Sequence, residues 1–235
     1  MYGIDIATLD KFITLPEAKK ETCGSFTRIV DVPEYRLERY VLISGASVPF
    51  EVSAKFDTTL SVEEGAVSVE ALSLGRHELT LLPPGAKGRI TAKEASVVYM
   101  FSGAPSPAEY GKKLVPTDHR DKYWGEIESI ISRENYAAKR MVVKKSGAAS
   151  LEYHCRKLET YFIHSGKLLL RNRAGRGEDR FFTLEAGSAV LTPPGLMHQR
   201  GGLEDTVIIE ISTKDEDSDS FLVEDGAKIR MPQLP

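Results

Sequence analysis

Two stretches decide the fold of this chain: residues 147–166, GAASLEYHCRKLETYFIHSG, and residues 187–198, GSAVLTPPGLMH. Glu152 and His154 are two residues apart, so on a strand both side chains leave the same face. Glu159 follows with room for a bend, and His198 comes from a distant hairpin behind a Pro-Pro-Gly turn that fixes the backbone. Two carboxylates and two imidazoles suit a divalent metal. The spacing therefore indicates a metal site inside a small β-barrel.

The two stretches resemble the two sequence motifs of the cupin superfamily. The second motif, with its Gly, Pro-x-Gly and His, matches residues 187–198 without a gap. The first motif matches from His154 to Gly166, with Glu152 where the family usually has its first histidine. The resemblance implies an all-β, jelly-roll (double-stranded β-helix) fold. It also implies one divalent transition metal (Mn, Fe, Zn, Co or Ni), with these ligands: Glu152, His154, Glu159 and His198.

Other interpretations of these residues remain open. His154 could be the first histidine of the motif, with Arg156 in the second place, but then only two residues would precede Glu159. We prefer Glu152 and His154 because their spacing and shared strand face both fit. The histidines could instead be core residues with hydrogen-bond partners, and Glu152 could be a catalytic base or an acid behind the ligands.

The chain also repeats itself weakly. Residues 44–47, SGAS, mirror residues 146–149, SGAA, and residues 81–85, LLPPG, mirror residues 191–195, LTPPG. The repeat predicts two tandem cupin barrels. We expect a degenerate barrel without metal ligands at 1–105, a linker rich in Pro and Gly at 106–120, and a metal-binding barrel at 121–235.

The first copy differs from the second at the predicted site. Ser53, Thr58 and Gly88 stand at the positions of His154, Glu159 and His198, and only Glu51 is retained, matching Glu152. We therefore expect a structural role for the first barrel, with a metal-free pocket for an organic ligand as the alternative.

Between about residues 121 and 226 the chain is similar to the cupin domain of type II mannose-6-phosphate isomerases. The similarity rests on Trp124-Gly125, Lys139-Arg140 and Glu224-Asp225, together with the two motifs, although Cys155 to Leu158 depart from the family pattern. It implies a metal-dependent isomerase or epimerase of a sugar or sugar phosphate that works through an enediolate. Candidate proton carriers are Glu152 and Lys139.

Three further residues are candidates for binding the substrate. Arg140 and Arg200 present planar forks to a phosphate or carboxylate, although they could equally be solvated strand charges. Tyr161 shares the inward face of Glu159, so it could line the pocket or belong to the core.

Two other functions remain compatible with the sequence. An iron-dependent cupin dioxygenase needs open coordination positions. Two carboxylate ligands make the site more anionic, which slightly disfavours this function. A non-catalytic sugar-binding or structural bicupin would use the metal only to organise a ligand site. Of the catalytic and non-catalytic alternatives, we expect an enzyme.

Composition limits the partners. A net charge of −3 without a basic block gives no reason to expect nucleic acid or a membrane as a partner. The two cysteines form no disulfide framework and the first residues do not resemble a secretory signal, so a cytoplasmic protein is expected. A homodimer is a further possibility suggested by the family. The acidic run at 214–220 is interpreted as a solvated loop.

Overall fold

The computed structural model describes residues 4–228, which divide into two compact units. The N-unit comprises residues 16–118 and 129–138, and the C-unit comprises residues 4–15, 119–128 and 139–228. Neither unit is continuous in sequence. The predicted boundaries at 105 and 121 remain a prediction, as does the arrangement as two barrels.

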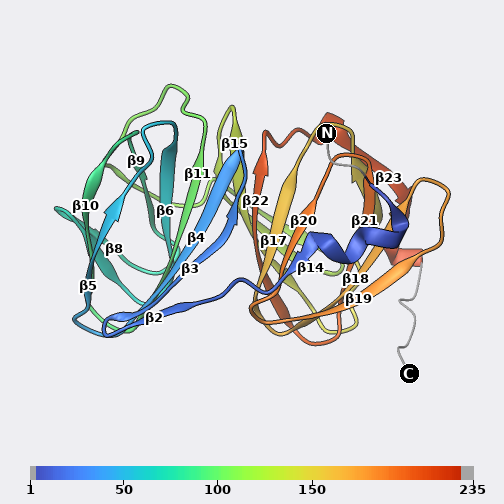
Figure 1. Cartoon of the computed structure of the whole chain (residues 1–235), viewed down its shortest axis with the longest axis horizontal. Helices are drawn as coiled ribbons and strands as arrows, with labels where there is room; N and C mark the ends of the chain where they lie inside the picture. Colours follow the sequence, from blue (N-terminus) through green and yellow to red (C-terminus); the bar gives the residue numbers. More distant parts are fainter. Residues whose placement is uncertain (1–3, 229–235) are drawn as a thin grey trace. The chain divides into compact units, whose positions relative to one another are not determined.

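The N-unit contains two antiparallel sheets (Figure 1). The seven-stranded sheet runs in the order β12 (Lys113–Leu114), β9 (Leu79–Leu82), β6 (Asp57–Glu64), β11 (Ser96–Gly103), β4 (Tyr35–Leu42), β3 (Gly24–Asp31) and β2 (Lys19–Glu21). The four-stranded sheet runs in the order β5 (Ser47–Glu51), β10 (Lys87–Ala92), β7 (Val67–Val69) and β8 (Leu72–Leu74). Apolar side chains from both sheets form one core, including Phe50, Leu60 and Met100.

The C-unit repeats this two-sheet plan. Its seven-stranded sheet runs in the order β1 (Ile13–Thr14), β20 (Ala189–Thr192), β17 (Glu159–Ser165), β22 (Thr206–Thr213), β15 (Tyr136–Val143), β14 (Gly125–Ser132) and β13 (Asp118–Lys122). Its five-stranded sheet runs in the order β19 (Arg180–Glu185), β18 (Lys167–Ala174), β21 (Leu196–Gly202), β16 (Leu151–His154) and β23 (Ser220–Glu224). Strands β13, β14 and β15 are each divided between the two units.

The predicted all-β fold is confirmed. Helical turns among residues 4–228 are limited to the 3-10 segments η1 (Ile6–Phe12), η2 (Asp217–Asp219) and η3 (Gly226–Lys228). Short runs rich in β-branched and aromatic residues, broken by Gly and Pro, form the strands. Within the described range, no helix has the length and apolar character needed to cross a bilayer.

The two Pro-Pro-Gly turns occupy equivalent places in the N-unit and the C-unit. Gly85 and Gly195 both adopt a left-handed backbone, with φ of 72° and 85°, which glycine reaches without steric cost. After each turn the chain enters an equivalent strand, β10 or β21. This is how the second turn delivers His198 to the sheet that carries Glu152.

Candidate metal centre

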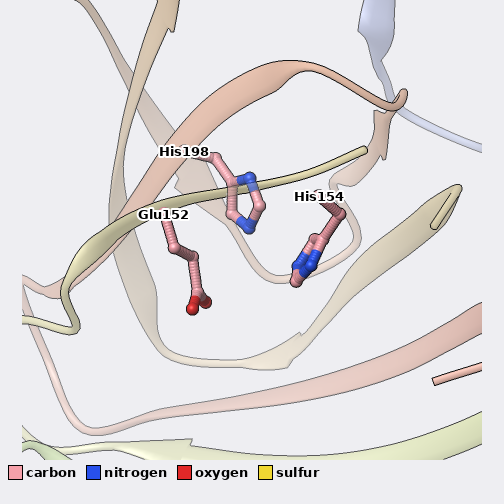
Figure 2. Close-up of side chains that lie close together, drawn as sticks. All are labelled: Glu152, His154 and His198. Atoms are coloured by element: carbon pink, nitrogen blue, oxygen red, sulfur yellow. The ribbon is translucent and has the colours of Figure 1, made fainter. Parts of the chain in front are cut away.

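Three of the four predicted ligands meet on neighbouring strands of the five-stranded sheet. Glu152 and His154 lie on β16, and His198 lies on β21, where it pairs across the ladder with Glu152. One ligand atom from each residue lies within 4.8 Å of the other two. Figure 2 shows the three side chains projecting from the ribbon into one space. The two-residue spacing on β16 therefore puts both side chains on the cavity side, as predicted.

Glu159 comes from the other sheet. It is the first residue of β17 and is fully buried, and its Oε1 lies 2.9 Å from Nε2 of His198. Its Oε2 lies 3.7 Å from Nε2 of His154. Tyr161 donates its phenolic hydrogen to Oε1 of Glu159, and the same hydroxyl lies 3.1 Å from Nε2 of His198. The structure thus gathers all four predicted ligand residues, three from the five-stranded sheet and one from the seven-stranded sheet.

The backbone orients both imidazoles. Nδ1 of His154 lies 2.9 Å from the carbonyl oxygen of Asp219, and Nδ1 of His198 lies 3.1 Å from that of Leu196. A carbonyl can only accept, so each Nδ1 carries a hydrogen, and Nε2 is the atom of each ring that could bind a metal. Second partners of this kind fix the ring of a metal-binding histidine.

Burial and charge set the protonation of these groups. Burial lowers the pKa of His154, which favours the neutral ring that a metal requires. Burial opposes ionisation of Glu159, but the nearby Lys157 ammonium and His198 outweigh it, so the pKa of Glu159 is well below its usual value. Burial raises the pKa of the Tyr161 phenol well above its usual value, so this side chain is a hydrogen-bond donor.

A buried lysine adjoins this group. The Nζ of Lys157 lies 2.6 Å from Oε2 of Glu159, 3.2 Å from Oδ1 of Asp215 and 3.4 Å from Oε1 of Glu210. Burial disfavours its charge, but the three carboxylates outweigh burial and raise the pKa of Lys157. Sequence reasoning missed Lys157 and Glu210 as cavity residues. The alternation of β22 could have flagged Glu210, which falls between the apolar residues Ile209 and Ile211.

The site opens into a polar cavity of about 160 Å³. Its lining includes Glu152, His154, Lys157, Arg200 and Glu210. This volume lies below the several hundred Å³ of pockets for drug-sized ligands, so the cavity suits a small polar molecule.

Arg200 anchors Glu152 inside this cavity. Its Nη2 donates to Oε1 of Glu152 at 2.7 Å, and its Nη1 donates to the Tyr161 hydroxyl at 3.1 Å. The hydroxyl of Ser220 donates to Oε2 of Glu152 at 3.0 Å. Burial opposes the charge of Glu152, but Arg200 and His198 outweigh it and lower the pKa of Glu152. Both carboxylate oxygens therefore have partners, and the group is a carboxylate at neutral pH.

The predicted substrate residues do not all reach the cavity. Lys139 and Arg200 line it, and Lys139 is paired with Oδ2 of Asp215 at 2.6 Å. Tyr161 is buried and reaches the ligand group through its hydroxyl. Arg140 lies between Lys139 and Met141 on β15, so it points to the other face of the strand, where it lies 3.7 Å from Glu126. The structure does not bring Arg140 to the cavity.

The interpretation of residues 214–220 as a solvated loop is wrong for part of this segment. Asp219 is only 4% exposed. Its carboxylate accepts hydrogen bonds from three consecutive backbone amides, at 3.1 Å from Cys155 and Arg156 and at 2.9 Å from Lys157. Asp215 and Ser220 line the cavity. The acidic composition of this segment suggested a solvent-exposed loop, because composition does not show which carboxylates accept hydrogen bonds from backbone N–H groups.

The predicted equivalence of Glu51 and Glu152 is also wrong, by one residue. In the N-unit Phe50 pairs with Gly88, just as Glu152 pairs with His198 in the C-unit. Phe50 is buried, whereas the Glu51 side chain is 66% exposed and pairs with Lys87. The Phe50 ring packs on Gly88, where a Cβ would come within 2.8 Å of its Cζ. An aromatic ring thus occupies the place where the C-unit puts a carboxylate.

A second group of possible metal ligands lies elsewhere on the C-unit. Nε2 of His119 is 3.5 Å from Asp121 and 3.9 Å from Glu126, but His119 and Asp121 are exposed and none of the three lines the cavity. The buried group fits a divalent transition metal better, because two oriented imidazoles and a buried carboxylate already converge there.

Comparisons with known proteins point to the same fold. No family model and no curated protein sequence matches the chain. Among solved structures, a point variant of Bacillus subtilis oxalate decarboxylase has a TM-score of 0.69 and 13% identity over 88% of this chain and 77% of that chain. An oxalate decarboxylase described for its substrate binding mode has a TM-score of 0.67 and 14% identity over the same shares.

A third structure is described for the Mn(II) centres of Bacillus subtilis oxalate decarboxylase. It has a TM-score of 0.67 and 13% identity over 88% of this chain and 77% of that chain. These neighbours are members of the cupin superfamily, so the chain has a cupin fold. The predicted resemblance to mannose-6-phosphate isomerases is not found among them.

Proposed function

We propose that this protein is a metal-dependent cupin enzyme whose centre lies in the C-unit, with His154, Glu159 and His198 as the metal ligands. The observation that carries the proposal is the convergence of the two Nε2 atoms on Oε1 and Oε2 of Glu159, at 2.9 Å and 3.7 Å. A divalent metal bound there would polarise the oxygens of a bound carbonyl compound. Two imidazoles and one carboxylate leave further coordination positions open for such a substrate.

Glu152 is assigned the proton-transfer role. It is close enough to the imidazoles to reach the same ion, but Arg200 and Ser220 already bind both of its oxygens. An ionised, half-buried carboxylate that lies beside the ligands and is held by an arginine can take a proton from a carbon next to a carbonyl. Lys139 is assigned no proton transfer of its own, because its ammonium is held in an ion pair with Asp215.

The charge of the cavity indicates the substrate class. The cavity lining carries five carboxylates and five cations, and Glu159, paired with Lys157, adds a sixth carboxylate: Glu152, Glu210, Asp215, Glu216 and Asp217 with Arg120, Lys122, Lys139, Lys157 and Arg200. A dication changes the net charge of this set from −1 to +1, which stabilises an anion or the negative charge of an enediolate. We therefore propose a small sugar or sugar phosphate as the substrate, and isomerisation or epimerisation as the reaction.

A second candidate follows from the same charge and from the fold. The neighbouring structures are oxalate decarboxylases, and a cavity that becomes positive on metal binding also suits a small carboxylic acid. Release of carbon dioxide from such an acid distinguishes this reaction from isomerisation.

Elemental analysis of the protein purified without added metal is the first test. We expect about one equivalent of a transition metal in the parent and almost none in a His154→Ala, His198→Ala double variant. A variant with His119→Ala should retain the metal. The loaded protein is then incubated with aldose and ketose phosphates in D₂O, where deuterium at the carbon beside the carbonyl reports proton transfer.

The outcomes separate the alternatives. Metal that is retained by the double variant overturns the proposed centre. Bound metal with carbon dioxide release favours the decarboxylase, oxygen uptake favours a dioxygenase, and saccharide binding without turnover favours a non-catalytic protein.

A further inference from the structure

Lys157 is a positive charge placed inside a candidate metal centre. Its side chain is 5% exposed, and its Nζ lies 2.6 Å from Oε2 of Glu159. On its other side the ammonium meets Asp215 at 3.2 Å and Glu210 at 3.4 Å. A buried ammonium held by several carboxylates stays in place, because breaking one pair leaves an uncompensated charge.

The two oxygens of Glu159 consequently serve different partners. Oε1 accepts from Tyr161 and lies 2.9 Å from Nε2 of His198, whereas Oε2 forms an ion pair with Lys157 at 2.6 Å and lies 3.7 Å from Nε2 of His154. Two-oxygen coordination of a metal by Glu159 would require Oε2 to leave the ammonium. The arrangement therefore leaves Oε1 as the oxygen available to an ion.

We propose that Lys157 is a positioning residue that restricts Glu159 to one-oxygen coordination and weakens the binding of divalent metals. This inference rests on the proposed function only in requiring a metal at His154, Glu159 and His198. The ammonium repels a nearby dication, and its ion pair with Oε2 of Glu159 keeps one coordination position unfilled by protein. That position is then free for a second oxygen of the substrate, which is what chelation of adjacent oxygens needs.

The chain offers a matched control. Lys139 lies in the same cavity and pairs with the same residue, Asp215, at 2.6 Å. Within residues 4–228 Lys139 forms its ion pair with Asp215 and not with Glu159. Removing this charge changes the cavity without releasing Oε2 of Glu159.

The test is a titration with Mn²⁺ alone, followed by the electron paramagnetic resonance of free and bound Mn²⁺. We expect Lys157→Met and Lys157→Gln to bind Mn²⁺ at least about tenfold more tightly than the parent, because a like charge has been removed. The spectrum of the bound ion should change in Lys157→Met, because both oxygens of Glu159 can then bind the ion. Lys139→Met should stay within about threefold of the parent and keep its spectrum.

Lys157→Gln retains a donor for Glu159, so it decides the question if Lys157→Met fails to fold by circular dichroism. Affinity that is unchanged or weaker in the folded Lys157 variants overturns the inference while leaving the metal centre intact. An equal gain in Lys139→Met also overturns it, because the effect would then be one of general cavity charge. Parent protein and variants that all bind no Mn²⁺ overturn both this inference and the proposed function.

Discussion

The backbone carbonyl of Asp219 accepts a hydrogen bond from Nδ1 of His154 at 2.9 Å, while the Asp219 carboxylate binds the three amides that follow His154. One residue thus fixes both the ring of a candidate ligand and the bend that leads to Glu159. The acidic segment before β23 is therefore part of the support of the centre.

Replacing Asp219 by alanine should weaken the centre without removing a ligand. Three amides lose their acceptor, which we expect to cost about 1–3 kcal/mol of unfolding free energy. Loss of a supporting partner should reduce metal affinity by about 10–100-fold. Urea unfolding and metal titration measure the two effects. Asp217→Ala is the control, since this side chain is 98% exposed on the same 3-10 turn. Equal behaviour of the two variants would argue against the supporting role.

Glu152→Gln should separate proton transfer from metal binding. We expect the variant to retain its metal, because His154, Glu159 and His198 remain, and to lose turnover by about 10²–10⁴-fold. Metal content and deuterium incorporation are measured on the same preparation. Glu51→Gln, an exposed glutamate of the N-unit, should change neither quantity. Loss of the metal along with turnover would instead identify Glu152 as a ligand.

Phe50→Ala tests the interior of the N-unit. The ring is buried and packs on Gly88, so its removal leaves a cavity that costs about 3–5 kcal/mol of unfolding free energy. The neighbouring Glu51→Ala should stay within about 0.5 kcal/mol, since its side chain is exposed. Urea unfolding curves give both values. Similar stabilities for the two variants would show that the ring does not fill this interior.

Asp179→Asn should alter the dependence of stability on pH. Asp179 accepts hydrogen bonds from Arg171 at 2.7 Å and from Arg173 at 2.8 Å and 3.1 Å. Partial burial opposes its charge, but the hydrogen bonds from Arg173 and Arg171 outweigh burial and lower the pKa of Asp179. A lowered folded pKa means that this carboxylate stabilises the fold above its unfolded pKa of about 3.9 and loses that effect as the pH falls through the folded value.

The stability difference between parent and Asp179→Asn should therefore be largest near pH 6.5 and shrink toward pH 2.5. Urea unfolding at both pH values measures it. Glu224, which also pairs with Arg171 and Arg173, remains in both proteins, so its own titration largely cancels in the difference. A difference that does not vary with pH would contradict this account.

Much of the candidate site could be read from spacing. Glu152 and His154 share a strand face because strand side chains alternate, and the Pro-Pro-Gly turn sets where the strand of His198 begins. The structure brings these residues together with Glu159, although their role as metal ligands stays a prediction. Spacing could not place Arg140, because which face of β15 borders the cavity depends on the opposite sheet.

Periodicity and turn chemistry were enough to predict an all-β chain and the shared face of Glu152 and His154, and the resemblance to the two motifs implied the cupin fold. Only the tertiary structure decided the partners of those residues. Lys157, Glu210 and Asp219 reach the centre because β16, β22 and the segment before β23 pack around one cavity. Cross-strand pairing likewise shows that Phe50, and not Glu51, is the counterpart of Glu152 in the N-unit. The difference matters because a shift of one residue along a strand moves a side chain from the core to the solvent.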